Sequence, residues 1–300
     1  MIDMILEIAP VFITYYLVAL GHGFFEKSGV LNLAIDGLFI VAASVAFVGA
    51  VYTLNPWVGV LSAAVITALF GVFLAYVTTK FPVSHGAVGL SLMFLGYGIG
   101  LIFGIPANFY ANSQRIKSAD YTFRITPDVE VMMFIIPLII GFLLLYILNY
   151  TKLGASIRAA GENPHAAAAL GVDVLRTRLI AGAIGYALIG VGGAFFTLAW
   201  RSGWDPKIYL LGYGWLAFAI SLSAGRHPLV TAINAGIFAT LVKYQYLIQT
   251  TTGISTEVAK MLPFIAAIIA MVIFNVTPLR RILAPPASLG KIYYKEEKTV

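Results

Sequence analysis

Cysteine is absent from this chain of 300 residues, and charged residues make up only 11% of it. The absence of cysteine excludes disulfides, thiolate metal sites and cysteine nucleophiles. The scarcity of charge excludes an ordinary soluble domain, in which about a quarter of the residues are charged. Apolar residues make up 60% of the chain instead, so we expect an integral membrane protein.

The sequence motifs of intramembrane enzymes and of ATPases are also missing. The chain contains no H-E-x-x-H, no G-x-S-x-G and no G-x-x-x-x-G-K-S/T phosphate loop. No two of its four histidines stand at the spacing of helical metal ligands. We therefore predict no catalytic residues, no metal and no ATP site in this chain.

Apolar runs of membrane length recur along the whole chain. A spanning helix needs about 20 apolar residues, so about nine helices account for the apolar fraction. The runs lie at 4–21, 33–54, 57–79, 86–105, 131–148, 179–200, 208–224, 229–248 and 258–277. They predict an all-α, polytopic transmembrane helix bundle of about nine helices, between 8 and 10, with residues 1–300 forming a single domain.

Basic residues are divided unevenly between the segments that join these runs. If the runs alternate across the membrane, twelve of the nineteen Lys and Arg residues share a side with segment 149–178 and tail 278–300. Basic residues in short loops stay in the cytoplasm. We therefore predict a multi-pass protein of the cell (inner or plasma) membrane, with this loop and tail cytoplasmic and segment 106–130 outside. Charge gathered in this way indicates orientation rather than a nucleic-acid partner.

The stretch 22–37 interrupts the apolar pattern with several polar side chains. Polar backbone at membrane depth is tolerated only where protein or a water-filled cavity satisfies it, so this stretch predicts a broken or re-entrant helix. Asn32 and Asp36 lie one helical turn apart in it, and an ionisable group within the membrane indicates function by default. We name both as candidates for a translocation path, together with Ser91 and Asn234, which are polar residues inside apolar runs. Capping of broken helix ends, or bonding to neighbouring helices, is the alternative for these four residues.

The loop on the predicted cytoplasmic side contains a short predicted helix. Asn163 can cap it, Pro164 suits its first position, and Gly171 suits a left-handed turn after its end. Two turns of alanine-rich helix do not persist alone in water, so this helix must dock on the membrane domain or on a partner. Arg158 and Glu162 supply charges that could orient the docking. An amphipathic element lying on the membrane surface is the alternative.

Several of these segments resemble a known family. The run RAAGENP from Arg158 to Pro164, continuing through the alanines to Gly171, is similar to the cytoplasmic loop of permease subunits of ABC importers for simple sugars and nucleosides. This is the permease family of the branched-chain amino acid and ribose type. The segment from Gly21 to Gly37 resembles the N-terminal motif of the same family, which usually has glutamate where this chain has Asp36. The turn from Gly225 to Pro228 resembles the family's Gly-Arg-x-x-Pro turn, one residue shorter.

The resemblance implies a membrane-spanning permease subunit of an ABC importer. It would translocate a simple sugar or a nucleoside delivered by an extracytoplasmic solute-binding protein. Its other partners would be ABC ATPase subunits and a second permease, a different but related chain. ATP and magnesium would be bound by the ATPase, which leaves no cofactor in this chain.

Within the family, the helix at Pro164 would be the coupling helix, seated on the ATPase subunit. The residues implied to carry this coupling are Arg158, Gly161, Glu162, Asn163, Pro164, Ala167, Ala168 and Gly171. The alternative function is an ion-coupled secondary transporter. Such a transporter needs intramembrane charges to carry the coupling ion, and beyond Asp36 and Glu7 the predicted runs contain few.

Overall fold

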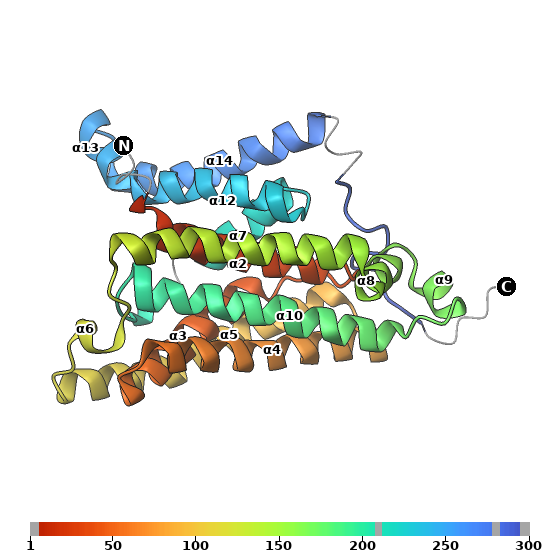
Figure 1. The fold of residues 1–300 in the computed structure, drawn as a ribbon, viewed down its shortest axis with the longest axis horizontal. Helices are drawn as coiled ribbons and strands as arrows, with labels where there is room; N and C mark the ends of the chain where they lie inside the picture. Colours follow the sequence, from red (N-terminus) through yellow and green to blue (C-terminus); the bar gives the residue numbers. More distant parts are fainter. Residues whose placement is uncertain (1–5, 208–211, 278–282, 295–300) are drawn as a thin grey trace.

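The computed structural model describes residues 6–207, 212–277 and 283–294. These residues form helices and connecting turns without any strand, so the all-α prediction is confirmed (Figure 1). The helices are α2 (Ala9–Glu26), α3 (Ile35–Thr53), α4 (Pro56–Lys80), α5 (His85–Ser113), α6 (Ser118–Tyr121), α7 (Pro127–Tyr150), α8 (Lys152–Glu162), α9 (Pro164–Ala169), α10 (Val174–Phe195) with a π turn (Phe196–Trp200), α11 (Tyr213–Ser223), α12 (Pro228–Lys243), α13 (Gln245–Thr252) and α14 (Thr256–Val276).

Each of the nine predicted runs overlaps at least one of these helices, but the helices differ in length. Within the described residues, five are long and apolar enough to cross a membrane, namely α3, α4, α5, α7 and α10 with its π turn. α11 has only 11 residues, so it is about 16 Å long and covers roughly half of the hydrocarbon layer. The run predicted at 229–248 is interrupted, because α12 ends at Lys243 and α13 begins at Gln245.

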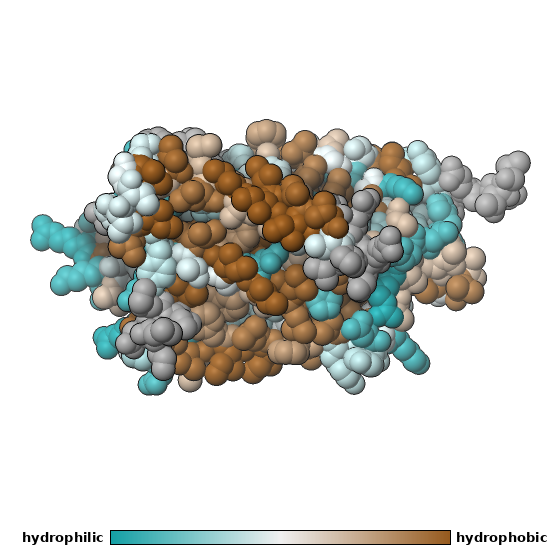
Figure 2. Space-filling model, turned by 90° about the horizontal axis from the view of Figure 1, so that it is seen from above, coloured by the Kyte–Doolittle hydropathy of each residue, from teal (hydrophilic) through white to brown (hydrophobic). Residues whose placement is uncertain are grey.

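The connecting segments gather at the two ends of the bundle. α6 and α13 lie at one end, and α8 and α9 lie at the other (Figure 1). The segments predicted as loops at 106–130 and 149–178 are therefore on opposite sides, as alternating spans require. Figure 2 shows hydrophobic side chains covering the middle of one face, with hydrophilic side chains gathered toward its two ends. A lipid bilayer favours this distribution of apolar and polar surface.

The centre of the bundle is built from α2 and α10. All 18 residues of α2 are buried, and α10 packs against α2, α3 and α4. Glycines allow the close crossings: a Cβ added to Gly71 of α4 would lie 2.4 Å from the carbonyl oxygen of Gly182. A Cβ added to Gly21 of α2 would lie 2.2 Å from the carbonyl oxygen of Gly185. α10 therefore contacts two neighbouring helices backbone to backbone, as small residues permit in membrane proteins.

The polar stretch 22–37 is a broken helix, as predicted. α2 continues to Glu26, five residues beyond the predicted end of the first run, and α3 begins at Ile35. The backbone between them has no regular secondary structure at 30–34, and most of these residues are buried. The first run was predicted to end at residue 21 because His22 and Glu26 are polar, yet both lie inside the helix and are fully buried.

Candidate functional site

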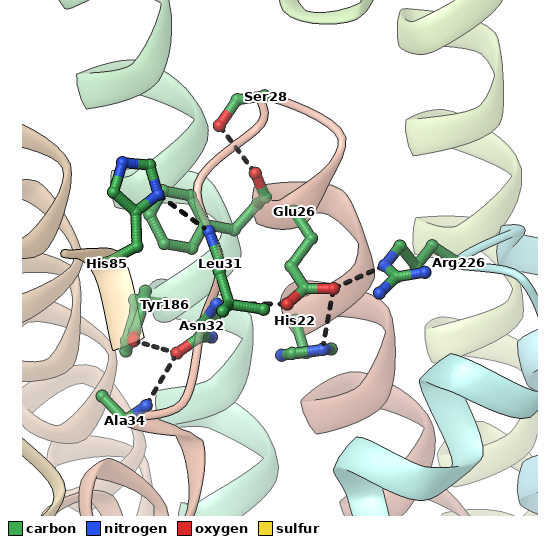
Figure 3. Close-up of polar contacts among 10 residues, drawn as sticks. His22, Glu26, Ser28, Leu31, Asn32, Ala34, His85, Tyr186 and Arg226 are labelled. Atoms are coloured by element: carbon green, nitrogen blue, oxygen red, sulfur yellow. Dashed lines mark hydrogen bonds and ion pairs between the residues drawn. The ribbon is translucent and has the colours of Figure 1, made fainter. Parts of the chain in front are cut away.

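The break between α2 and α3 exposes backbone N–H groups that the helices cannot satisfy, and side chains accept them (Figure 3). The Leu31 N–H donates to His85 Nδ1 at 3.3 Å. The Asn32 N–H donates to Glu26 Oε1 at 3.1 Å, and the Ala34 N–H donates to Asn32 Oδ1 at 3.2 Å. The polar side chains of this stretch therefore stabilise an irregular backbone deep in the bundle.

Glu26 is fully buried and holds two further polar groups (Figure 3). Its Oε2 atom accepts a hydrogen bond from Arg226 Nε at 2.5 Å and lies 3.3 Å from His22 Nε2. Arg226 stands in the turn between α11 and α12 with a φ of +59°, and its side chain is nearly buried. The ion pair thus joins two of the motifs that resemble the permease family, 200 residues apart in the chain.

Asn32 links the break to α10. The Tyr186 hydroxyl donates to Asn32 Oδ1 at 2.5 Å, and both side chains are buried (Figure 3). The same oxygen accepts the Ala34 N–H just before α3. Among the described residues, Asn32 Nδ2 has no hydrogen-bond partner. Asn32 therefore binds the backbone just before α3 through its amide oxygen, while its amide nitrogen has no partner within the described residues.

Asp36 lies in the first turn of α3, 1% exposed, where it also meets the start of α11. Its Oδ1 atom accepts the Gly214 N–H at 2.8 Å and the Trp215 N–H at 3.2 Å. Its Oδ2 atom accepts the Tyr97 hydroxyl at 2.5 Å. The first N–H groups of α11 thus face a carboxylate that itself stands in the first turn of α3. This contact explains why α11 begins inside the bundle: its first N–H groups bind Asp36.

The depth of Asp36 follows from its partner on α5. Tyr97 stands twelve residues after the start of that helix at His85, which corresponds to about 18 Å along its axis. Tyr97 therefore lies in the middle part of a helix that is long enough to cross a hydrocarbon layer about 30 Å thick, and Asp36 lies beside it. Tyr97 and Trp215 are both half-buried, so they separate the buried carboxylate from the outer surface of the chain.

Aromatic rings continue from this point along α11. The rings of Trp215 and Phe218 are 5.5 Å apart, and the ring of Phe218 lies 5.0 Å from that of His22. Phe218 is half-buried, like Trp215. The row of Trp215, Phe218 and His22 therefore connects the Asp36 site to the Glu26 ion pair.

The structure does not bring the other two path candidates to Asp36. Ser91 is exposed on α5, and its hydroxyl donates to the Ala87 carbonyl oxygen at 2.8 Å within the same helix. Asn234 Nδ2 on α12 donates to Ser223 Oγ on α11 at 3.0 Å. The Asn234 bond is a contact with a neighbouring helix, which was the alternative for this residue, whereas the Ser91 bond stays within α5.

The short helix in the 149–178 segment is present, and its ends are formed as predicted. Asn163 Oδ1 accepts the N–H groups of His165 and Ala166 at 3.1 and 3.0 Å, and Pro164 is the first helical residue. Gly171 has a φ of +88°, and the Val172 N–H donates to the Ala167 carbonyl oxygen at 3.0 Å. This pair of features is a Schellman ending, for which glycine is favoured.

The predicted coupling residues of α9 lie on two different faces of the helix, one buried and one exposed. Ala167 is 2% exposed and packs with Ala160, Val174 and Tyr293, so it faces the rest of this chain. Ala168 is exposed, and Leu170, which follows the helix, is 86% exposed. Of the two alanines that we expected to form a docking surface, only Ala168 is available to a partner.

A C-terminal strap, residues 283–294, fastens α8 to the break after α2. The Ser288 N–H donates to the Gly161 carbonyl oxygen at 3.0 Å, and the Ala287 N–H donates to Glu162 Oε2 at 3.2 Å. The Gly290 N–H donates to the Gly29 carbonyl oxygen at 3.1 Å. The Ser288 hydroxyl also donates to the Gly161 carbonyl oxygen, at 2.5 Å. The strap was not predicted from the sequence, because most of its bonds involve backbone groups that any residue carries.

Gly161 and Arg158 hold α8 on the membrane domain. A Cβ added to Gly161 would lie 2.2 Å from the Lys27 carbonyl oxygen, so α8 ends in direct contact with the turn after α2. Arg158 Nη1 donates to the Leu148 carbonyl oxygen and to Asn149 Oδ1 at the end of α7. The predicted coupling segment is therefore bound to α2, α7 and the strap.

Comparisons with known proteins agree with this architecture. The family described as "Branched-chain amino acid transport system / permease component" matches residues 4–271. The chain belongs to this permease family. No solved structure matches it.

Curated relatives match over most of the permease. It is 25% identical to the nucleoside ABC transporter permease protein NupC of Lactococcus lactis subsp. cremoris, over 98% of this chain and 96% of that protein. It is 26% identical to the guanosine ABC transporter permease protein NupQ of Bacillus subtilis, over 97% and 94% of the two chains. A putative glucose ABC transporter permease protein of Haloferax volcanii is 29% identical over 75% of this chain and 71% of its own. The permease is thus a subunit of an ABC transporter.

The part of the permease that the structure describes holds no group of three or more His, Cys, Asp or Glu residues that is suited to a metal ion. In its polar centre, each charged side chain is instead paired with other side chains or with backbone N–H groups. Glu26 meets Arg226, and Asp36 meets Tyr97 and two backbone N–H groups.

Proposed function

We propose that the permease translocates a nucleoside past Asp36, along a path between this chain and a second permease. The observation that carries the proposal is the buried carboxylate beside the middle part of α5, behind the half-buried side chains of Tyr97 and Trp215. A carboxylate offers about four lone-pair sites, and three are used by the Gly214, Trp215 and Tyr97 donors. One acceptor site is left for a hydroxyl of the solute once Tyr97 or Trp215 moves aside.

The neighbouring rings support a solute with a flat face. Trp215 and Phe218 lie on α11 beside the carboxylate. Nucleobases and the faces of sugar rings both stack on aromatic rings. The two relatives that match nearly the whole chain are named for nucleosides and guanosine, and the glucose-type relative matches over 75% of it. We therefore favour a nucleoside, with a simple sugar as the second candidate.

The energy for transport would come from ATP bound, with magnesium, by separate ATPase subunits that receive α9. Exposed Ala168 and Leu170 give that helix a small, apolar contact surface. A displacement of α9 would pass through α8 to the Gly161–Lys27 contact, and from there along the break to Asn32 and Asp36. The hydrogen bond from the Asn32 N–H to Glu26 would transmit this movement to the buried polar centre.

The end of the bundle that carries α8, α9 and the strap would face the cytoplasm, because the side with twelve of the nineteen basic residues is the cytoplasmic one. A solute-binding protein would then deliver the solute at the opposite end. The chain lacks cysteine, so single cysteines report orientation directly. An impermeant thiol reagent applied to intact cells should label a cysteine at exposed Ser118 and spare one at exposed Ala155. The reverse pattern would invert the orientation.

The second permease would be a different but related chain, as in the nucleoside-type branch that this sequence resembles. Purification of a tagged copy from its native membrane tests this composition. We expect an ATPase, a second permease of related sequence and a binding protein to accompany it. Recovery of this chain as the sole permease, together with the ATPase, would show a homodimer instead.

Uptake by the reconstituted complex decides the function. With all subunits in proteoliposomes, we expect ATP-dependent uptake of labelled nucleosides that exceeds uptake of pentoses and hexoses. A preference for a hexose would transfer the assignment to sugars. Uptake driven by an ion gradient without ATP would overturn the importer and favour a secondary transporter.

A further inference from the structure

A second polar site lies at the α8 end of the bundle, outside the path and the coupling helix. It is a cavity of about 330 Å³ between the last turn of α7, α8, the start of α12 and the strap. Its lining combines charged and apolar groups: Lys27, Arg158, Arg226, His227, Leu145 and Leu148 are among them. A cavity of this size accommodates a phosphate group with part of its ester.

Positive charge predominates in this cavity. Three cations line it, from Lys27, Arg158 and Arg226, against one carboxylate, from Glu162. Glu162 accepts a strap N–H, and Arg226 is paired with Glu26 behind the cavity wall. In the described part of the chain, no carboxylate forms an ion pair with Lys27 or Arg158.

The ammonium of Lys27 is therefore left without a counter-charge of its own. Burial lowers the pKa of Lys27, and the nearby Arg226 and Arg158 guanidiniums lower it further, while Glu162 raises it. An anion bound in the cavity would relieve this repulsion between cations. The cavity thus has the excess of positive charge and the unpaired ammonium that are typical of an anion-binding site.

The depth of the cavity identifies the source of the anion. Tyr146 and Tyr150 of α7 are exposed, with rings 5.5 Å apart, in the last two turns of the helix. Exposed tyrosines at a helix end mark the headgroup level of a bilayer. Leu148 and Asn149, from the same turn, line the cavity, so its mouth lies where phospholipid phosphates lie. Leu145 adds an apolar wall one turn deeper, on the side of the acyl chains.

We propose that this cavity binds the phosphate of an anionic phospholipid, held by Lys27 and Arg158. Basic pockets between membrane helices at the headgroup level are suited to such lipids. The bound phosphate would bridge the turn after α2 to α8, next to the Gly161 contact. The lipid would therefore stabilise the end of the bundle to which α8 and α9 are fastened.

Native mass spectrometry of the full-length permease tests the site. The protein is released from nanodiscs that contain equal parts of phosphatidylglycerol and phosphatidylcholine, and the lipids that remain bound are counted. We expect retained phosphatidylglycerol in the wild type. Lys27→Gln should lower its apparent affinity about fivefold, the effect of one cation near the headgroup layer, while Lys27→Arg retains it.

Lys80→Gln is the matched control, because Lys80 is an exposed lysine at the same end of the bundle that does not line this cavity. Circular dichroism confirms that each variant is folded. Equal loss of phosphatidylglycerol in the Lys27→Gln and Lys80→Gln variants would overturn the proposal, since it would show only general surface charge. So would equal retention of both lipids. Displacement of the lipid by inorganic phosphate alone would assign the cavity to a soluble anion and overturn the lipid site.

Discussion

The polar centre and the strap end of the permease hold irregular backbone in opposite ways. In the centre, buried side chains accept the free N–H groups: Glu26 holds Asn32, and Asp36 holds the start of α11. At the strap end, backbone mainly meets backbone, as in the bond from Ser288 to Gly161 and the bond from Gly290 to Gly29, and the side chains of Ser288 and Glu162 add to these bonds. The first arrangement depends on the identity of each side chain, and the second depends on the space that glycine leaves.

This difference separates two kinds of sensitivity. A buried charge that loses its partner is left in a medium of low dielectric, so the centre is sensitive to charge. A backbone contact survives most side-chain changes and fails only when added volume pushes it apart. We therefore expect changes in charge to disrupt the centre and changes in volume to disrupt the strap end.

The largest effect is expected from Arg226→Ala. It leaves Glu26 buried without its guanidinium partner, which costs about 3–5 kcal/mol for a buried pair. We expect little of this variant in the membrane and a lower unfolding temperature in detergent. The double variant Glu26→Gln, Arg226→Gln removes both charges and should recover much of the loss. A fully stable single variant would show that the pair does not hold the centre together.

Gly161→Ala is expected to rank second. The new methyl group would lie 2.2 Å from the Lys27 carbonyl oxygen, and relief of such overpacking typically costs about 1–3 kcal/mol. We expect the variant to insert normally and to lose most solute-stimulated ATP hydrolysis, because α8 is pushed away from the turn after α2. Gly236→Ala is the control, since a Cβ there meets nothing within 4 Å. If both variants retained full solute-stimulated ATP hydrolysis, the contact between Gly161 and Lys27 would not transmit movement from α9 to the centre.

Asp36→Asn should lower transport about tenfold, the effect of weakening one charge-assisted hydrogen bond. The amide is an isostere and retains one acceptor oxygen for the Gly214 N–H, so we expect normal insertion. Uptake rates at matched membrane levels measure the effect. Transport equal to the wild type would support the reading in which Asp36 only caps α11.

Ala168→Glu tests the exposed side of α9. A bulky, charged side chain on a small apolar surface should lower the amount of co-purified ATPase about tenfold. Ala155→Glu, also exposed but on α8, is the matched control. Ala167→Glu is a different experiment, because Ala167 is buried against Tyr293 and its replacement should unfold α9 itself. An unchanged amount of ATPase with Ala168→Glu would move the coupling role to another segment at this end.

The smallest effect is expected from Glu162→Ala. Glu162 is exposed and accepts one N–H from the strap, so its removal should cost about 1 kcal/mol or less. We expect a modest decrease in coupled ATP hydrolysis and no change in solute uptake per ATP. Glu162→Gln should behave as the wild type, because the amide oxygen still accepts the Ala287 N–H. A loss as large as that of Gly161→Ala would place a partner contact at Glu162.

Local chemistry explains which parts of this molecule were predictable. The ends of α9 followed from Asn163, Pro164 and Gly171, because a cap, a fixed φ and a left-handed turn are properties of single residues. The order of apolar runs and their alternation followed from composition in the same way. The length of α11 did not, since its start is set by the carboxylate of Asp36, 178 residues earlier.

Long-range pairing explains what the sequence concealed. Glu26 and Arg226 each lie in a motif that resembles the permease family, yet nothing in either motif indicates that the two side chains bind each other. Tyr97 and Tyr186 are ordinary aromatic residues of apolar helices until the fold places their hydroxyls on Asp36 and Asn32. The strap was not predicted because alanine, serine and glycine carry no periodic signal.

The glycine crossings of α10 limit how this protein can change shape. At Gly71–Gly182 and Gly21–Gly185 the backbones are too close for one helix to slide or turn past another without a collision. Helices α2, α4 and α10 should therefore move as one rigid body. The conformational cycle then reduces to tilting these three helices together relative to the short helix α11. Distances between spectroscopic labels on α2, α4 and α10 should remain constant through the transport cycle, while distances from these helices to a label on α11 should change.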